Sequence, residues 1–183
     1  MLQDAGVPFE TMPARIDEAA VKSSMLNDGA PPRDIADTLA GLKAEKIARK
    51  CPGRLVLGSD QVLSFEGDIL DKPDTVDEAR EHLRRLRGKT HQLISAVVFK
   101  RDHDTTFKHI EVARLTMRDF SDDFLEDYLG KEGEAILACV GAYRLEGHGA
   151  QLFSRIIGDY FTILGLPFLP SLEHLRHQGI IQT

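Results

Sequence analysis

Several charged or polar side chains stand where the surrounding pattern is apolar. Asp60 and Gln61 interrupt an otherwise apolar strand, and Lys72 follows soon after, directly before a proline. Lys43 and Lys46 border or interrupt the apolar face of a helix. Mg²⁺ is typically held by one or two carboxylates plus substrate phosphates. Carboxylates and lysines of this kind, taken together, therefore suggest a site for a metal and a polyphosphate.

Each of these residues also has a purely structural interpretation. Taken singly, Glu18, Glu146 and the lysines are more often surface charges than catalysts, and Lys46 can place its stem on the apolar face with its amine in water. An unpaired carboxylate is costly to bury. For residues 58–61, a sheet edge or a bulge with a solvated Asp60 is therefore the alternative to a catalytic site.

The histidines do not have the spacing of a metal site. His103 and His109 flank a hairpin turn, and His174 and His177 lie three residues apart near the end of the chain. Neither pair has a third ligand at metal spacing, so all four are expected to be solvated. The sequence also lacks the GxSxG, HExxH and Walker phosphate-loop patterns.

Composition places the chain among globular proteins. It has 183 residues, 42% of them hydrophobic, and a formal net charge of -6, which argues against a nucleic-acid coat or a binder of anionic membranes. Cys51 and Cys139 form no CxxC pattern and are expected to be buried thiols in a reducing compartment. The sequence shows neither an apolar run of membrane-span length nor a signal peptide, so a soluble cytoplasmic protein is expected.

Periodicity predicts the elements of the first part of the chain. Residues 21–33 are rich in Ser, Asn, Asp, Gly and Pro and are expected to be mostly loop. A helix is expected from Asp34 to about Lys50, followed by the interrupted strand and a hairpin turn at residues 66–68. The apolar stripe of this helix is formed by Ile35, Leu39, Leu42 and Lys46, with Lys43 beside it.

In the second part, Thr75 and Glu78 form a capping box, and the helix that they begin should end at Gly88. Strands are expected at residues 91–99 and 107–117, and a helix from Ser121 to Gly130. A Gly-rich section at residues 141–158 and an apolar segment at 161–169 precede a last helix at 172–177. This mixture predicts an α/β or α+β domain.

Short motifs give a more specific indication. The segments IDE, LAGLKAEKIA, GSDQVL, DKP, a helix ending in RG, GAYRLEG, GDY and GLP follow one another between Gly6 and Gly179. In content and order they resemble the Maf family of nucleoside triphosphate pyrophosphatases. The resemblance implies an α/β fold, a mixed twisted sheet with flanking helices, in which two lobes enclose a cleft within a single domain over residues 1–183. It also implies a divalent metal cation, Mg²⁺ or Mn²⁺, and often a homodimer.

The resemblance further implies hydrolysis of a nucleoside triphosphate to the monophosphate and pyrophosphate, with no nucleic-acid polymer or membrane as partner. Asp60 matches the family's proton acceptor and is expected to be catalytic and, with Glu18, to bind the metal. The strand is expected to end in the cleft, so that Asp60 faces water. The residues expected to bind substrate are Glu18, Lys43, Gln61, Lys72 and Glu146.

Glu146 stands where many Maf proteins have Gln, and with residues 58–61 it resembles the branch that prefers 7-methyl-GTP over dTTP and UTP. A surface pair with Arg144 or His148 is the structural alternative. The family normally opens with a strand and a Leu-Ala-Ser-x-Ser-x-x-Arg phosphate loop, which this sequence does not contain, so weak or no activity is expected. Three functions stay open: an active pyrophosphatase, a non-catalytic nucleotide-binding or regulatory protein related to cell division, and a structural protein that uses its dimer surface.

Overall fold

A computed structural model describes residues 1–182 and divides into two compact units. Unit 1 comprises Met1–Asp60, Ser95–Glu111 and the segment from Gly165 onward, and unit 2 comprises Gln61–Ile94 and Val112–Leu164. Helices and strands alternate, so the predicted α/β class is confirmed. The two units agree with the expected two lobes, while the single domain over residues 1–183 stays a prediction.

The sheet has five strands in the order β2-β1-β3-β4-β5. The strands are β1 (Leu55–Phe65), β2 (Asp68–Leu70), β3 (Thr90–Arg101), β4 (Asp104–Met117) and β5 (Phe153–Ile157). β1 and β2 pair antiparallel across Glu66 and Gly67, whose positive φ angles of 52° and 94° suit a tight hairpin. The predicted hairpin and the strands β3 and β4 are confirmed, whereas β5 lies in the Gly-rich section, where the pattern predicts no strand.

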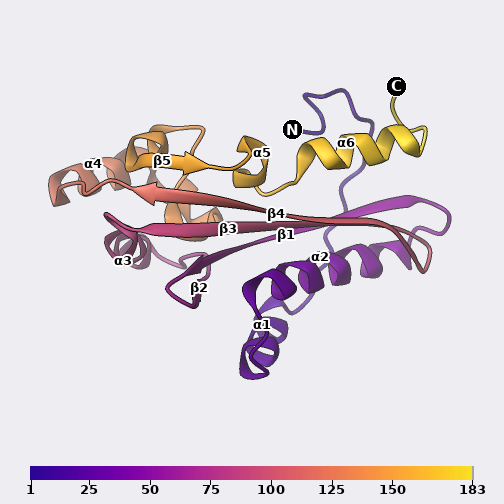
Figure 1. Ribbon diagram of the computed structural model, residues 1–183, viewed down its shortest axis with the longest axis horizontal. Coiled ribbons are helices and arrows are strands. Elements are labelled where there is room, and N and C mark those ends of the chain that lie inside the picture. Colours follow the sequence, from indigo (N-terminus) through magenta and orange to yellow (C-terminus); the bar gives the residue numbers. More distant parts are fainter. Residues whose placement is uncertain (183) are drawn as a thin grey trace. The chain divides into compact units, whose positions relative to one another are not determined.

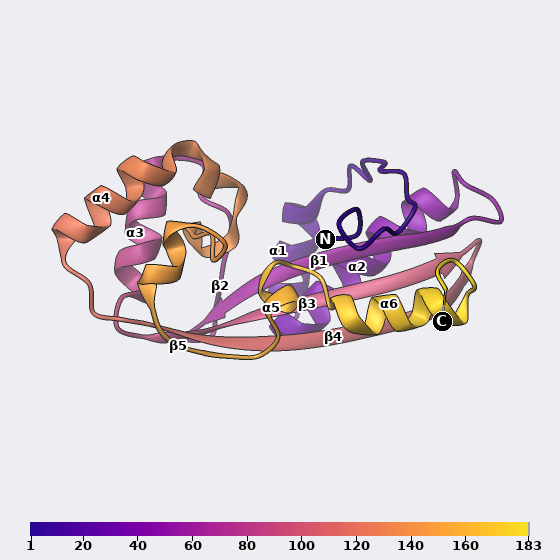
Figure 2. The ribbon, with the colours of Figure 1, turned by 90° about the horizontal axis from the view of Figure 1, so that it is seen from above.

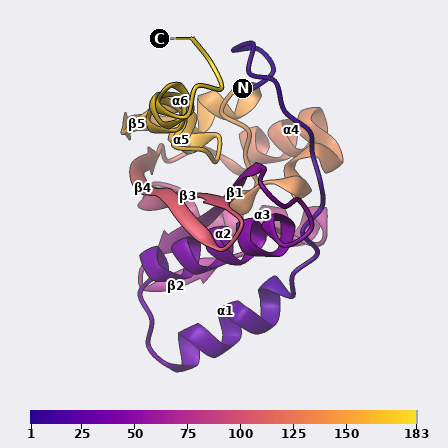
Figure 3. The ribbon, with the colours of Figure 1, turned by 90° about the vertical axis from the view of Figure 1, so that its right-hand side faces the viewer.

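Six α-helices and three short 3₁₀ helices are described within residues 1–182. They are α1 (Glu18–Asn27), α2 (Pro32–Ala48), α3 (Val76–Leu86), α4 (Asp122–Glu132), α5 (Tyr160–Ile163) and α6 (Phe168–His177), with short 3₁₀ helices η1 (Gly133–Ala138), η2 (Val140–Ala142) and η3 (His148–Leu152). In unit 1, α2 and α6 cover opposite faces of the strands (Figures 1 and 3). In unit 2, α3 and α4 lie side by side (Figure 2).

The prediction that residues 21–33 are mostly loop is wrong, because α1 occupies residues 21–27 of this segment. The Asp17 side chain accepts a hydrogen bond from the amide of Ala20 and so begins the helix. No residue of α1 is buried, and the helix lies on the side of α2 away from the strands (Figures 1 and 3). Its apolar pattern is too weak to be recognised from periodicity.

The predicted stripe of α2 is also partly wrong. Leu42 is 38% exposed and Lys46 is exposed, while the face toward the strands is built largely from small residues. The buried residues of α2 are Ile35, Ala36, Leu39, Ala40, Ala44 and Ala48. Alanines at this spacing let the helix axis come close to the sheet, which a stripe of leucines would prevent.

On the strand side, Gly58 of β1 makes this close contact with α2. A Cβ atom at Gly58 would lie 2.4 Å from the carbonyl oxygen of Ala40 and 2.6 Å from the amide nitrogen of Ala44. Only glycine therefore fits here, and the Gly58–Ala44 contact sets the height of α2 over the strand.

The expected end of the strand at Asp60 is wrong as well, since β1 runs without a break through Asp60 to Phe65. Burial alternates along it, so that Val56, Gly58, Asp60 and Val62 are buried on one side. The polar residues between them, Ser59 and Gln61, form hydrogen bonds with main-chain carbonyls. Asp60 is thus a buried position of a regular strand and does not mark a strand end.

The Thr75 cap of α3 is confirmed, since the amide of Glu78 donates to Thr75 Oγ1. The Glu78 side chain accepts from the amide of Asp74, one residue before the expected partner in the capping box. α4 runs past Gly130, where an end was expected, because Gly133 supplies the positive φ of 56° that stops it. α6 begins at Phe168, before the expected start at residue 172.

The expectation that His174 is solvated is wrong. His174 is buried in unit 1, with its ring 4.8 Å from that of Phe107 and stacked on it. Cys51 and Cys139 are free and half-buried rather than buried. Within residues 1–182, no helix is long and apolar enough to cross a membrane.

Candidate active site

Three charged side chains meet in unit 1. Lys43 Nζ lies 2.6 Å from Asp60 Oδ1 and 2.9 Å from Glu18 Oε1. The side chain of Asp60 is only 6% exposed, whereas that of Glu18 is 43% exposed. Strand β1 carries Asp60, helix α2 carries Lys43, and Glu18 opens α1. The cluster therefore joins a buried carboxylate to a solvent-accessible one through a shared lysine.

Burial controls the electrostatics of this cluster. It raises the pKa of Asp60 above the ordinary value, and the hydrogen bond and charge of Lys43 offset this only in part. Burial alone would lower the pKa of Lys43, but the hydrogen bonds and charges of Asp60 and Glu18 outweigh it and raise that pKa. Asp60 is thus a stronger proton acceptor than a free aspartate, and Lys43 stays charged beside it.

One oxygen of Asp60 remains available. Oδ2 is buried, and no residue in the range 1–182 gives it a hydrogen bond. A buried carboxylate oxygen without a partner is unfavourable unless a water, a cation or a ligand completes it. The atom therefore fits a position that a divalent cation or an attacking water would fill.

A hollow of about 250 Å³ lies beside the cluster in unit 1. Glu18, Lys43, Gly58 and Ser59 line it together with the segment at residues 12–16. Lys46 Nζ donates to the carbonyl oxygen of Arg15 at 2.6 Å, so this lysine ties the segment to α2. Arg15, with a positive φ of 48°, is a cationic residue of the hollow that the sequence analysis misses. No periodic pattern or motif singles it out.

Ser59 and Gln61 lie on the opposite side of β1 from Asp60 and bind main-chain carbonyls. In unit 1, Ser59 Oγ lies 2.9 Å from the carbonyl oxygens of both Ala96 and Gly165, and its single proton is donated to one of them at a time. In unit 2, Gln61 Nε2 donates to the carbonyls of Thr162 and Ile163 at 2.9 and 3.2 Å. The Gln61 contacts lie within the last turn of α5, and the Gly165 contact lies just after that helix. The substrate-binding role of Gln61 stays a prediction.

In unit 2, the charges of Lys72 and Glu146 both act on the thiol of Cys139. Burial raises the pKa of Cys139, the charge of Glu146 adds to this, and Arg144 and Lys72 act in the opposite direction. Glu146 itself is half-exposed, and Arg144 Nε lies 3.4 Å from its Oε1. The surface pair with Arg144 is therefore present, although it is long for a strong ionic hydrogen bond.

The Gly-Ala-Tyr part of the same motif is structural. Tyr143 is buried, and its hydroxyl lies 2.7 Å from Nε2 of His91, which is also buried. Burial lowers the pKa of His91 to about 4, so its ring is neutral at physiological pH. Tyr143 thus fixes the start of the segment from which Glu146 projects.

A buried carboxylate on α4 is a second group that the sequence analysis misses. The side chain of Glu132 is only 5% exposed. It faces Arg144 and His148, on either side of Glu146. In the sequence, Glu132 is one of several charges at the end of an amphipathic helix, and only its contacts reveal it.

Comparison with known proteins identifies the family of this chain. The model of the Maf-like protein family matches residues 1–178. The chain is 47% identical over 181 residues to the 7-methyl-GTP pyrophosphatase of Brucella abortus biovar 1, covering 99% of this chain and 91% of the relative. It is 50% identical over 179 residues to the nucleoside triphosphate pyrophosphatase of Roseobacter denitrificans, covering 98% and 90%.

These similarities define the class of protein. The chain belongs to the Maf-like family. Its relatives at similar identity carry two different names, one specifying 7-methyl-GTP and one specifying nucleoside triphosphates in general. Overall identity therefore does not select the base.

Proposed function

We propose that this protein hydrolyses nucleoside triphosphates to the nucleoside monophosphate and pyrophosphate. The observation that carries the proposal is Asp60, a buried carboxylate with a raised pKa, one oxygen on Lys43 and the other without a partner in the described chain. The names of the relatives support the same reaction. Nothing observed favours a non-catalytic nucleotide-binding protein.

Asp60 is the proposed acceptor of the proton from the attacking water. A base works best when its pKa lies near the working pH, and burial moves Asp60 in that direction. Water oriented by Oδ2 attacks the α-phosphorus in line, and the pyrophosphate leaves. Lys43 holds Oδ1 and therefore fixes the orientation of the carboxylate.

A divalent cation, Mg²⁺ or Mn²⁺, is the proposed cofactor, with Asp60 and Glu18 as protein ligands. Within residues 1–182, no cluster of three or more His, Cys, Asp or Glu side chains could hold a metal alone. Two carboxylates fit a cation that also takes phosphate oxygens from its substrate. When bound, such a cation offsets the negative charge of the triphosphate. Lys43 and Lys72 are proposed to add positive charge, as compact ammonium groups.

The proposed substrate in particular is 7-methyl-GTP, through Glu146. A carboxylate only accepts hydrogen bonds, whereas the Gln of other Maf proteins also donates. The guanine edge offers adjacent N–H donors, and methylation of the ring adds positive charge that strengthens them. Uracil and thymine would direct carbonyl oxygens toward the anion. The half-exposed side chain of Glu146 is available for such contacts.

The test of the proposed function is release of pyrophosphate from a panel of triphosphates, with and without Mg²⁺ or Mn²⁺. We expect metal-dependent release that is fastest with 7-methyl-GTP, and little release by the Asp60→Asn variant. A protein that is thermally stabilised by nucleotides but releases no pyrophosphate would instead be a non-catalytic nucleotide binder.

We further propose a homodimer that forms through the exposed face of α6. Leu169 is 58% exposed, and with Pro170, Glu173, Arg176 and His177 it lines a surface hollow of about 530 Å³. Neither Glu173 nor Arg176 has an ion-pair partner in the described part of the chain. A second α6 packed antiparallel would place Glu173 opposite Arg176 twice, related by the two-fold axis. Antiparallel helix dipoles also attract.

A further inference from the structure

Glu132 is a buried titratable group to which the proposed reaction assigns no role. Its Oε1 accepts from the main-chain amide of His148 at 3.0 Å and lies 3.2 Å from His148 Nδ1. Its Oε2 lies 3.5 Å from Nη1 of Arg144. One buried carboxylate thus faces three donors, all from a single short segment of the chain.

That segment is a closed turn with Glu146 in it. The amide of Gly147 donates to the carbonyl of Arg144 at 3.2 Å, which closes the turn around Leu145 and Glu146. Leu145 packs against the core of unit 2, while Glu146 is half-exposed. The turn therefore directs one side chain inward and presents the other.

The turn and the carboxylate fit each other closely. A Cβ atom at Gly147 would lie 2.9 Å from Glu132 Oε1, so any larger residue there would push the carboxylate away. At Gly149 a Cβ atom would lie 2.3 Å from the carbonyl oxygen of Arg144, so the chain passes directly over the start of the turn. Gly149 is thus required by its contact with the backbone, whereas a residue larger than Gly147 would displace the Glu132 carboxylate.

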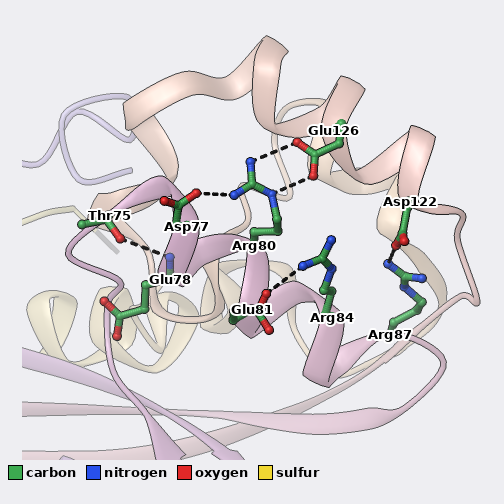
Figure 4. Close-up of polar contacts among 9 residues, drawn as sticks. All are labelled: Thr75, Asp77, Glu78, Arg80, Glu81, Arg84, Arg87, Asp122 and Glu126. Atoms are coloured by element: carbon green, nitrogen blue, oxygen red, sulfur yellow. Dashed lines mark hydrogen bonds and ion pairs between the residues drawn. The ribbon is translucent and has the colours of Figure 1, made fainter.

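The helix that carries Glu132 is itself held firmly. Arg80 of α3 donates through Nε and Nη2 to both carboxylate oxygens of Glu126, at 2.7 and 3.0 Å (Figure 4). Arg87 pairs with Asp122 at the first turn of α4 (Figure 4). The two pairs tie both the start and the middle of α4 to α3. Glu132, at its end, is therefore a fixed point for the turn.

We propose that Glu132 is a positioning residue for base selection: it holds the turn at residues 144–148 so that Glu146 is presented in one orientation. This inference rests on the proposed role of Glu146. A carboxylate suits the task because it accepts from all three donors, whereas an amide in its place would direct N–H groups at one of them. Burial strengthens these hydrogen bonds, and it makes their loss costly.

The test compares Glu132→Gln with a matched control, Asp127→Asn. The control neutralises an exposed acid on the same helix, which among residues 1–182 pairs only with Lys131. We would measure the hydrogen exchange of the amides at positions 147 and 148. We would also measure the competition between 7-methyl-GTP and UTP. We expect about tenfold faster exchange and about fivefold weaker discrimination in Glu132→Gln, with kcat for UTP nearly unchanged, and wild-type behaviour in the control. Should Glu132→Gln fail to fold, Gly147→Ala displaces the same carboxylate from the turn side and should have both effects.

The outcomes separate the two proposals. Unchanged amide exchange in Glu132→Gln or Gly147→Ala would overturn the positioning role. Faster exchange with unchanged discrimination would also overturn it, provided that Glu146→Gln does change discrimination. If Glu146→Gln leaves discrimination unchanged, the base-reading role of Glu146 fails, and the role of Glu132 in base selection falls with it, even where faster exchange shows that it still holds the turn.

Discussion

Lys43 Nζ lies 2.6 Å from one carboxylate oxygen of Asp60, and the other oxygen of Asp60 is buried without a partner within residues 1–182. This asymmetry gives the two oxygens different tasks. The first is held by a lysine that is itself shared with Glu18, so the carboxylate cannot rotate freely. The second is free for water or a cation, which is the arrangement that a base or metal ligand needs.

Asp60→Asn should abolish most of the turnover and keep the fold. The amide can still accept from Lys43, but it neither takes a proton nor binds a cation well, so we expect a loss of at least about a hundredfold in kcat. Pyrophosphate release measures the loss, and circular dichroism checks the fold. Asp104→Asn, at the exposed start of β4, is the control. Near-normal turnover of Asp60→Asn would remove Asp60 from the mechanism.

The same substitution should change how stability depends on pH. Because burial raises the pKa of folded Asp60, the wild type is most stable, relative to the variant, at pH values below the ordinary pKa of Asp. It loses this stability as the pH rises through the folded pKa. The melting temperature of Asp60→Asn minus that of wild type should therefore increase with pH above about 4 and then level off. A difference that is flat or falls with pH would contradict the raised pKa.

Gly58→Ala should destabilise the fold and disturb the site. The new methyl group would overlap the backbone of α2 at Ala40 and Ala44, and overpacking of this kind costs about 1–3 kcal/mol. Lys43, one residue before Ala44, should then lose its contact with Asp60. Gly41→Ala on the same helix is the control, since nothing lies within 4 Å of its Cβ position, and it should stabilise the helix by about 0.5–1 kcal/mol. Denaturant unfolding and pyrophosphate release would show both effects.

Glu146→Gln should weaken the preference for 7-methyl-GTP over UTP. One charge-assisted hydrogen bond is lost on the guanine edge, so the ratio of kcat/KM values should fall by the equivalent of about 1–3 kcal/mol. Competition between the two substrates measures the ratio directly. A variant with the wild-type ratio would mean that the half-exposed Glu146 only pairs with Arg144.

Exchanged charges on α6 should test the homodimer. Glu173→Arg alone and Arg176→Glu alone place like charges opposite each other in the proposed antiparallel pair, so each variant should be monomeric. When the two variants are mixed, every contact is again between opposite charges, and heterodimers should form. Analytical ultracentrifugation distinguishes these cases. Dimers of wild type that persist in both single variants would exclude this face.

Short-range patterns were sufficient wherever a feature depends on near neighbours in the sequence. The capping box of α3 joins Thr75 to Glu78, and the β1–β2 hairpin depends on the conformations of Glu66 and Gly67. Motif order was sufficient for the family and for Asp60, Glu18 and Lys43 as candidate site residues. α1 shows the limit of this approach, because its helix buries nothing and so leaves no periodic pattern.

Only the tertiary structure decided which charges meet. Lys43 and Lys46 look equivalent on the helix pattern, yet Lys43 binds Asp60 while Lys46 binds the carbonyl of Arg15. The Gly58–Ala44 contact determines which lysine reaches Asp60, because it sets how α2 lies on β1. Likewise, Ser59 and Gln61 form hydrogen bonds with carbonyls about a hundred positions further along the chain. Glu132 accepts a hydrogen bond from the turn around Glu146. Such pairings depend on packing between distant segments, which local sequence patterns do not encode.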